Sequence, residues 1–158
     1  MQKLGKEIYN SPRFQTSKKF MQHGEVSVKK HCEKVAYSSL WIARKLKIKV
    51  EEAEMIRGAL LHDYFLYDWH DDEHGHFWNL HGLKHPAIAL KNADEEFELT
   101  PRERDIIKKH MFPLTIVPPL CREAWIVTLA DKYISAGESI HFIKTRRRYN
   151  ELKNSDRR

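Results

Sequence analysis

The sequence predicts an all-α domain of about six or seven helices. Apolar residues recur at the three- and four-residue spacing of helices, whereas the alternating β-branched runs typical of strands are nearly absent. Serine, threonine, proline and glycine stand where helices would begin and end. The 158 residues suit one compact domain with a single core, and the chain has no internal repeat or low-complexity segment.

Three helices are predicted in the first part of the chain. The first covers residues 12–22, with Ser11 as its N-cap and Pro12 in its first turn, where a missing N–H does no harm. A long helix follows over residues 27–46 and a third over residues 50–62, each with an apolar face.

The next segment, residues 64–83, is an irregular insertion rich in aromatic, histidine and acidic side chains. So long a connection in a compact domain is more often functional than idle. A fourth helix is expected over residues 86–97, because Pro86 favours a helix start. Thr100 then caps a fifth helix, and Glu103 three residues later completes a capping box.

The last part of the chain carries two further helix patterns. Three prolines among residues 113–119 exclude a helix there. A sixth helix is expected over residues 120–136, with Gly137 able to stop it, and a last one over residues 139–149.

Composition narrows the class of protein. The chain is 41% hydrophobic and 32% charged, which is typical of a folded domain. No apolar run approaches the roughly 20 residues of a membrane helix, and the first ten residues lack the apolar segment of a secretory signal. We therefore expect a cytoplasmic protein without a membrane partner. Cys32 and Cys121 form no CxxC pair, and Cys32 fits a small buried hydrophobic residue.

The net charge of +6 is concentrated at the C-terminus. Residues 144–158 carry seven Lys or Arg and two acids, whereas residues 1–143 carry 21 basic and 20 acidic side chains and are nearly neutral. We therefore divide the chain into a helical domain, residues 1–143, and a basic tail, residues 144–158. A solvated tail is the simplest interpretation, and contact with RNA or another polyanion is the alternative.

Polar side chains on apolar helix faces are the candidates for chemistry. His31 shares a face with Val28, Asp131 shares one with Val127, and His110 follows an apolar pair. A buried carboxylate is costly unless it is paired or bound to a metal. One inward histidine is usually a hydrogen-bonded core residue, but several such groups from separate helices indicate a site.

The doublet His62-Asp63 follows the apolar stretch of the third predicted helix. Neighbours on a regular helix point about 100° apart, so both can reach one ion only where the helix ends. Imidazole and carboxylate together suit Mn, Fe, Co, Ni or Zn better than Ca. A second doublet, His70-Asp71, lies in the insertion and is not preceded by an apolar stretch. We do not expect it to bind the first metal.

His31, the segment LLHD (60–63) and the segment TLADKY (128–133) carry a family resemblance. Their order resembles the H…HD…D pattern of the HD-domain metal-dependent phosphohydrolase superfamily. KHCEKVAYSSLWIARKL and GALLHD also resemble that family's two ligand helices, and the match spans about residues 23–138. The resemblance implies a single-domain helical bundle around the metal.

The same resemblance implies the ligands. One metal would be held by His31, His62, Asp63 and Asp131. Some members hold a second metal with two further histidines, which His85 and His110 match in position, and Asp63 would then bridge both ions. The alternatives are that these two are polar helix-end residues, or that His81 takes the place of His85.

A phosphate-binding cation is also implied, and three lysines are candidates. We take Lys109, next to His110, as catalytic together with His62 and Asp63. The expected substrate contacts are Lys84, Lys132, His23 and Trp69.

The implied reaction is hydrolysis of a nucleotide or another small phosphate ester by water that one or two divalent transition metals activate. Aromatic rings of the insertion, Tyr67, Trp69 or Trp78, would stack on a base, unless the insertion is only a surface loop. Two other functions remain open: a di-iron oxygenase on the same ligands, and a non-catalytic module that binds RNA or protein through its tail. The sequence leaves the oligomeric state open.

Overall fold

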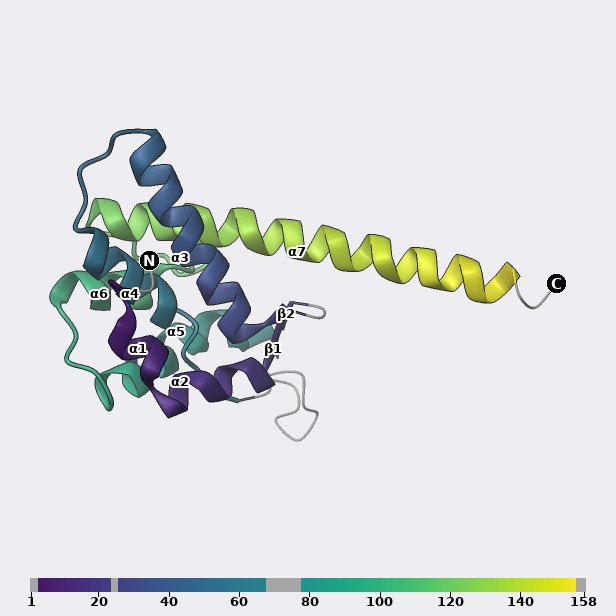
Figure 1. The fold of residues 1–158 in the computed structure, drawn as a ribbon, viewed down its shortest axis with the longest axis horizontal. Coiled ribbons are helices and arrows are strands. Elements are labelled where there is room, and N and C mark those ends of the chain that lie inside the picture. Colours follow the sequence, from purple (N-terminus) through teal and green to yellow (C-terminus); the bar gives the residue numbers. More distant parts are fainter. Residues whose placement is uncertain (1–2, 24–25, 68–77, 156–158) are drawn as a thin grey trace.

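The computed structural model shows a helical body from which one long helix projects (Figure 1). It describes residues 3–23, 26–67 and 78–155, and leaves out the side chains of residues 23, 78–82 and 149–155. The predicted all-α class is confirmed, with one short β-hairpin as the exception. The described elements, in chain order, are α1 (Lys6–Asn10), α2 (Pro12–Thr16), the 3-10 turn η1 (Ser17–Lys19), β1 (Met21–His23), β2 (Val26–Ser27), α3 (Val28–Lys45), α4 (Glu52–Leu61), α5 (Trp78–Asp94), α6 (Pro101–Lys109) and α7 (Arg122–Ser155).

The N-terminal segment departs from the predicted helix over residues 12–22. Ser11 caps α2 as expected, accepting a hydrogen bond from the Phe14 N–H at 3.0 Å. The helix ends at Thr16, where the buried Ser17 hydroxyl donates to the Phe14 carbonyl at 2.6 Å, and the chain then tightens into η1. The strands β1 and β2 pair antiparallel in place of the predicted last turns.

Helices α3 and α4 match the sequence prediction closely. Ser27 caps α3, and α4 ends at Leu61, directly before the His62-Asp63 doublet. Gly58 lets α4 approach α6, because a Cβ there would lie 2.7 Å from Cδ1 of Ile106. This close approach fixes the ends of α4 and α6 relative to each other.

Helix α6 begins with the predicted capping box of Thr100 and Glu103. The predicted start of α5 at Pro86 was wrong, because α5 begins at Trp78 and Pro86 lies inside it. Proline in a helix interior costs on the order of 3 kcal/mol, so the sequence rule favours a start where the structure has none. The irregular insertion is correspondingly shorter than predicted.

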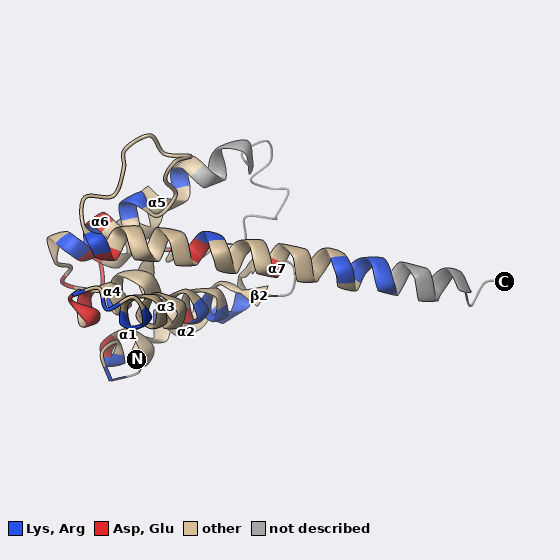
Figure 2. Cartoon of the chain, turned by 90° about the horizontal axis from the view of Figure 1, so that it is seen from above, with Lys and Arg blue, Asp and Glu red and all other residues tan. Residues whose placement is uncertain are grey.

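Helix α7 runs without a break from Arg122 to Ser155, so the prediction that Gly137 stops it was wrong. A single interior glycine costs only about 1 kcal/mol relative to alanine, and helix formers on both sides outweigh it. The exposed basic residues Lys144, Arg146, Arg147 and Arg148 lie on the projecting part, drawn blue in Figure 2. No helix among the described residues is both long and apolar enough to cross a membrane.

The core lies where α3, α4, α6 and α7 meet. Its largest apolar members include Met55, Ile56, Ile106 and Ile107, none of which has exposed surface. Several histidines and carboxylates are buried within this same region, so the fold brings them together at an apolar centre.

Candidate metal centre

Six buried polar residues from five separate segments converge in the middle of the helical body. Each comes from a helix or from the residues that follow one. They are His31 on α3, His62 and Asp63 after α4, His85 on α5, His110 after α6, and Asp131 on α7.

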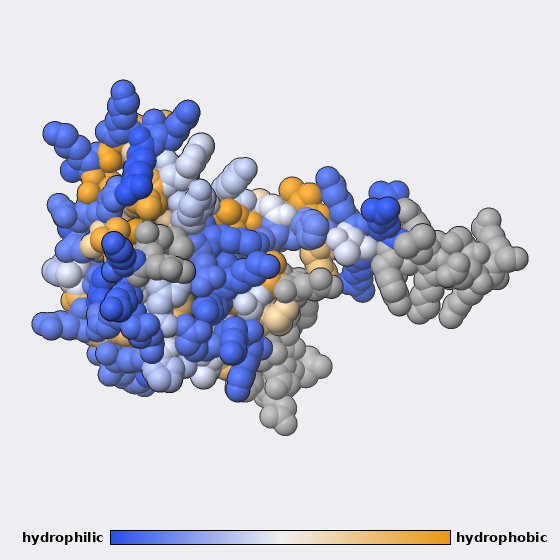
Figure 3. Space-filling model, viewed as in Figure 1, coloured by the Kyte–Doolittle hydropathy of each residue, from blue (hydrophilic) through white to orange (hydrophobic). Residues whose placement is uncertain are grey.

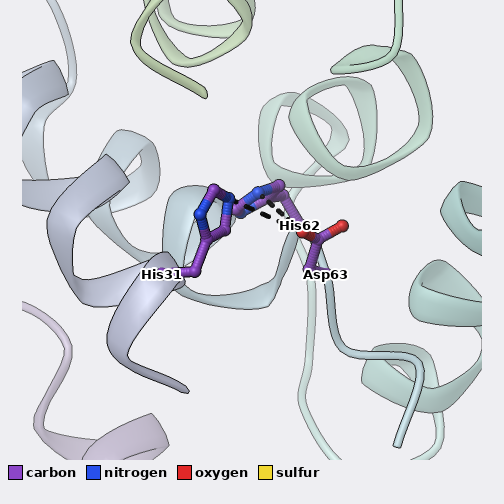
Figure 4. A group of neighbouring side chains, drawn as sticks. All are labelled: His31, His62 and Asp63. Atoms are coloured by element: carbon purple, nitrogen blue, oxygen red, sulfur yellow. Dashed lines mark ion pairs between the residues drawn. The ribbon is translucent and has the colours of Figure 1, made fainter. Parts of the chain in front are cut away.

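The first group, which we call set one, consists of His31, His62, Asp63 and Asp131. Nε2 of His31 lies 3.0 Å from Oδ1 of Asp131 and 3.7 Å from Oδ2 of Asp63. Nε2 of His62 lies 3.3 Å from the same Asp63 oxygen and 3.7 Å from Asp131. Figure 4 shows how His31 and His62 point toward Asp63. Two donors about 2.1 Å from one ion lie roughly 3 Å apart at a right angle, so these separations suit a shared metal.

The second group, set two, consists of His85, His110 and the other oxygen of Asp63. Oδ1 of Asp63 lies 3.1 Å from Nε2 of His85 and 3.4 Å from Nε2 of His110. The two Nε2 atoms lie 2.8 Å apart. Each oxygen of Asp63 therefore faces one set, which is the arrangement of a carboxylate that bridges two ions.

The doublet reaches both groups because α4 ends immediately before it. His62 is the C-cap residue of α4, and the chain turns through Asp63 before leaving the body. The two side chains are thus no longer bound to the angular spacing of a regular helix. The sequence prediction that the helix ends at the doublet is confirmed.

The imidazole rings are oriented by hydrogen bonds on the side away from the centre. Nδ1 of His62 donates to the Ala59 carbonyl at 2.7 Å, and Nδ1 of His110 donates to the Ile107 carbonyl at 2.8 Å. Because Nδ1 then carries the proton, Nε2 presents a lone pair to the centre in the neutral ring. Metal-binding histidines are commonly held in this way.

Two residues that the sequence interpretation missed contact the centre. Glu138, also on α7, accepts a hydrogen bond from Nδ1 of His31 at 3.0 Å. The buried amide of Gln22, on β1, donates to Oδ2 of Asp63 at 2.6 Å. Glu138 lies seven residues after Asp131 on the same helix face, so its helical spacing could have indicated it. Gln22 had no such signal, because its segment was predicted to be helical.

Burial and the neighbouring charges shift the pKa values of these side chains in opposite directions. Burial disfavours the charged imidazoles, but hydrogen bonds to Asp131 and Glu138 outweigh this and raise the pKa of His31. The charge of Asp63 likewise outweighs burial and raises the pKa of His62 well above its usual range. The pKa of Asp131 is lowered, despite burial, by its hydrogen bond with His31. In set one the metal-free histidines therefore favour the protonated form, whereas burial lowers the pKa of His110 in set two.

Two atoms of the centre support a metal rather than a closed hydrogen-bond network. Nε2 of His62 and Oδ1 of Asp63 are buried and form no well-aligned hydrogen bond among the described residues, although ring nitrogens lie 3.1 and 3.4 Å from Oδ1. An unsatisfied buried polar atom costs on the order of 1–3 kcal/mol. These two atoms belong to different sets, and a cation in each set would satisfy both. The residues present thus fit divalent metal binding.

Of the predicted substrate-contact residues, Lys132 lies beside the centre and the others are exposed or outside the described residues. Nζ of Lys132 lies 3.2 Å from the carbonyl oxygen of His110, beside set two. Lys84 is exposed on α5. The side chain of His23 and all of Trp69 lie outside the described residues, as do the side chain of His81 and the second doublet.

Lys109, the predicted catalytic cation, forms an ion pair with Asp105 at 2.8 Å. Asp105 in turn accepts hydrogen bonds from the backbone N–H groups of Leu120 and Cys121. This network holds the loop before α7, and within the described chain it directs the Lys109 ammonium to Asp105 rather than to either set. The catalytic role of Lys109 gains no support from this placement.

Comparison with known proteins agrees with the ligand pattern. The HD domain family matches residues 14–136, which include all six residues of sets one and two. A search of curated proteins and a search of solved structures each gave no match. The family match covers most of the chain, so the chain belongs to the HD domain family, within the superfamily of metal-dependent phosphohydrolases.

Proposed function

We propose that this protein hydrolyses a nucleotide or another small phosphate ester at sets one and two. The observation that carries the proposal is the division of the Asp63 carboxylate, whose two oxygens face different groups of histidine nitrogens. Two metals bridged by one carboxylate are typical of phosphoester hydrolysis.

The residues of the chain would act mainly by holding and positioning. His31, His62 and Asp131 would hold one divalent ion, His85 and His110 the other, and Asp63 both. When bound, the ions would supply a hydroxide nucleophile at neutral pH and stabilise charge on the phosphoryl oxygens. Phosphoryl transfer asks for little covalent chemistry from the protein beyond this positioning.

Lys132 is the cation best placed to contact the phosphate. Its ammonium lies next to the His110 carbonyl, and burial lowers its pKa while the charge of Asp131 opposes that shift. A partly buried lysine beside the centre can pair with a phosphate oxygen as a point charge.

Aromatic side chains beside set two support a nucleotide substrate. The ring of Phe65 stands edge-on to His85, with centroids 5.8 Å apart, and Tyr67 lies 5.1 Å beyond it. Tyr67 is half-buried, which leaves part of its ring able to stack on a base.

The test combines metal analysis with a phosphatase screen over nucleotides and simple phosphate esters, each with Mn, Fe, Co, Ni or Zn. The Asp63→Ala variant should lose bound metal and activity together. His141→Ala is the matched control, because His141 is exposed on α7 and outside both sets. Full turnover by Asp63→Ala would refute the proposal. Oxygen consumption by an iron-loaded protein that lacks phosphatase activity would replace it with the oxygenase alternative.

A further inference from the structure

Helix α7 carries apolar side chains on the side opposite the body as well as on the side that packs against it. Val127, Asp131 and Glu138 face the body and are buried. Roughly half a turn away, Leu129, Tyr133, Ile140 and Ile143 are 59%, 74%, 54% and 63% exposed. A helix that is apolar on both faces is normally covered on both. In Figure 3, hydrophobic surface lies on α7 where it leaves the body.

The outward residues follow the spacing of a helix-pairing seam. Leu129, Tyr133, Ala136, Ile140 and Ile143 are separated by four, three, four and three residues. This is the a/d spacing of a heptad, which pairs one helix with another. The seam extends over 15 residues, or roughly 22 Å of helix. It contains no charged residue, so its partner must also be an apolar helix.

We propose that the partner is a second copy of this chain, with the two α7 helices antiparallel. The seam is nearly symmetric about Ala136 and Gly137, so Leu129 would face Ile143 of the other copy and Tyr133 would face Ile140. A two-fold interface requires this self-complementarity. The small residues at the middle let the helices approach closely there, since helix separation depends on the side chains at the contact.

Charge selects the antiparallel orientation. A parallel pair would place the basic residues 144–148 of both copies side by side. An antiparallel pair separates them and carries each basic arm past the start of the partner's α7. The first turn of α4 lies at that end of the body, because the Glu51 N–H donates to Glu123 of α7 at 2.9 Å. Its carboxylates Glu52 and Glu54 are paired with Arg44 and Arg102 of the same chain, so the separation of the two basic arms is what favours the antiparallel pair. Figure 2 shows basic residues on the arm and both acidic and basic residues at the other end of α7.

The position of the seam also leaves room for both bodies. The body contacts α7 through Asp131 and Glu138, and the seam lies on the opposite side. Each body would therefore lie outside the helix pair. The pairing would bury neither set one nor set two.

Sedimentation equilibrium of the full chain over about 1–100 μM tests the dimer. The unaltered chain should show twice the monomer mass, and a Leu129→Glu/Ile140→Glu variant should show the monomer mass with unchanged helix content and metal binding. Ser139→Glu, an exposed change off the seam, is the control and should remain dimeric. A monomeric unaltered chain across this range overturns the proposal, including one that gains mass only with RNA or another protein.

Cysteine cross-linking tests the orientation without relying on a disruptive variant. In a Cys121→Ser background, a mixture of Leu129→Cys and Ile143→Cys chains should form a disulfide-linked pair at least ten times faster than either variant alone. Equal or faster linking of Ile143→Cys with itself overturns the antiparallel arrangement.

Discussion

Glu138 on α7 accepts a hydrogen bond from Nδ1 of His31 on α3 at 3.0 Å, and its other oxygen lies 2.8 Å from Nζ of Lys34. A carboxylate behind a ligating imidazole fixes the orientation of the ring and increases its basicity. His31 is therefore held from both sides, by Asp131 within set one and by Glu138 outside it.

Replacing Glu138 with alanine should weaken metal binding at set one by about 10- to 100-fold, because His31 loses the acceptor that orients it. The measurement is competition with a chelating dye. Lys34→Met is the control, since it keeps the His31 contact and should change affinity much less. Unchanged affinity in Glu138→Ala would show that the contact does not orient His31.

Removing one histidine from each set should separate the two metals. His31→Ala should keep the ion of set two, and His110→Ala should keep the ion of set one, because Asp63 serves both. Elemental analysis should then give one ion per chain for each variant and two for the unaltered protein. One ion in the unaltered protein, lost in only one of the variants, would indicate a mononuclear centre.

Stability should depend on pH in opposite ways with and without metal. The raised pKa values of His31 and His62 stabilise the metal-free fold below their ordinary value of about 6.5, and this contribution is lost as pH rises through the raised values. Metal binding requires neutral rings, so metal stabilisation should grow over the same range. Thermal melts from pH 6 to pH 9, with chelator or with Mn, measure both trends. Parallel curves in the two series would contradict this view of the cluster.

Gly58→Ala should lower the free energy of unfolding by about 1–3 kcal/mol, because its Cβ would meet Ile106 at 2.7 Å. Gly137→Ala is the matched change, since nothing lies within 4 Å of a Cβ there. It should stabilise the chain by about 0.5–1 kcal/mol. Urea unfolding in dilute protein, where α7 is unpaired, measures both; equal effects would mean that α4 and α6 do not constrain Gly58.

Two helix ends that carry strong local signals were predictable from sequence. The capping box at Thr100 is local chemistry, and it placed α6 correctly. The helix end at the doublet was predicted from the apolar stretch before it, and this located His62 and Asp63 correctly. The resemblance supplied the pairing of distant ligands, which periodicity alone could not provide.

The failures arose where other interactions, local or tertiary, outweigh a helix-boundary rule. Pro86 lies within α5 and Gly137 within α7, although each residue would ordinarily mark a helix boundary. Helix α2 ends before Ser17, earlier than predicted, and the hairpin that follows brings Gln22 to Asp63. Among these, the contact of Gln22 with Asp63 joins residues 41 positions apart, which no short window of sequence contains.

The shared carboxylate of Asp63 has a consequence for charge balance. The six proposed ligands supply only two negative charges, from Asp63 and Asp131, because the four histidines bind as neutral rings. Two divalent ions would bring four positive charges, so the loaded centre would keep an excess of two before any hydroxide or substrate binds. An anionic group such as a phosphate dianion would neutralise that excess, whereas an uncharged ester would leave it buried and uncompensated.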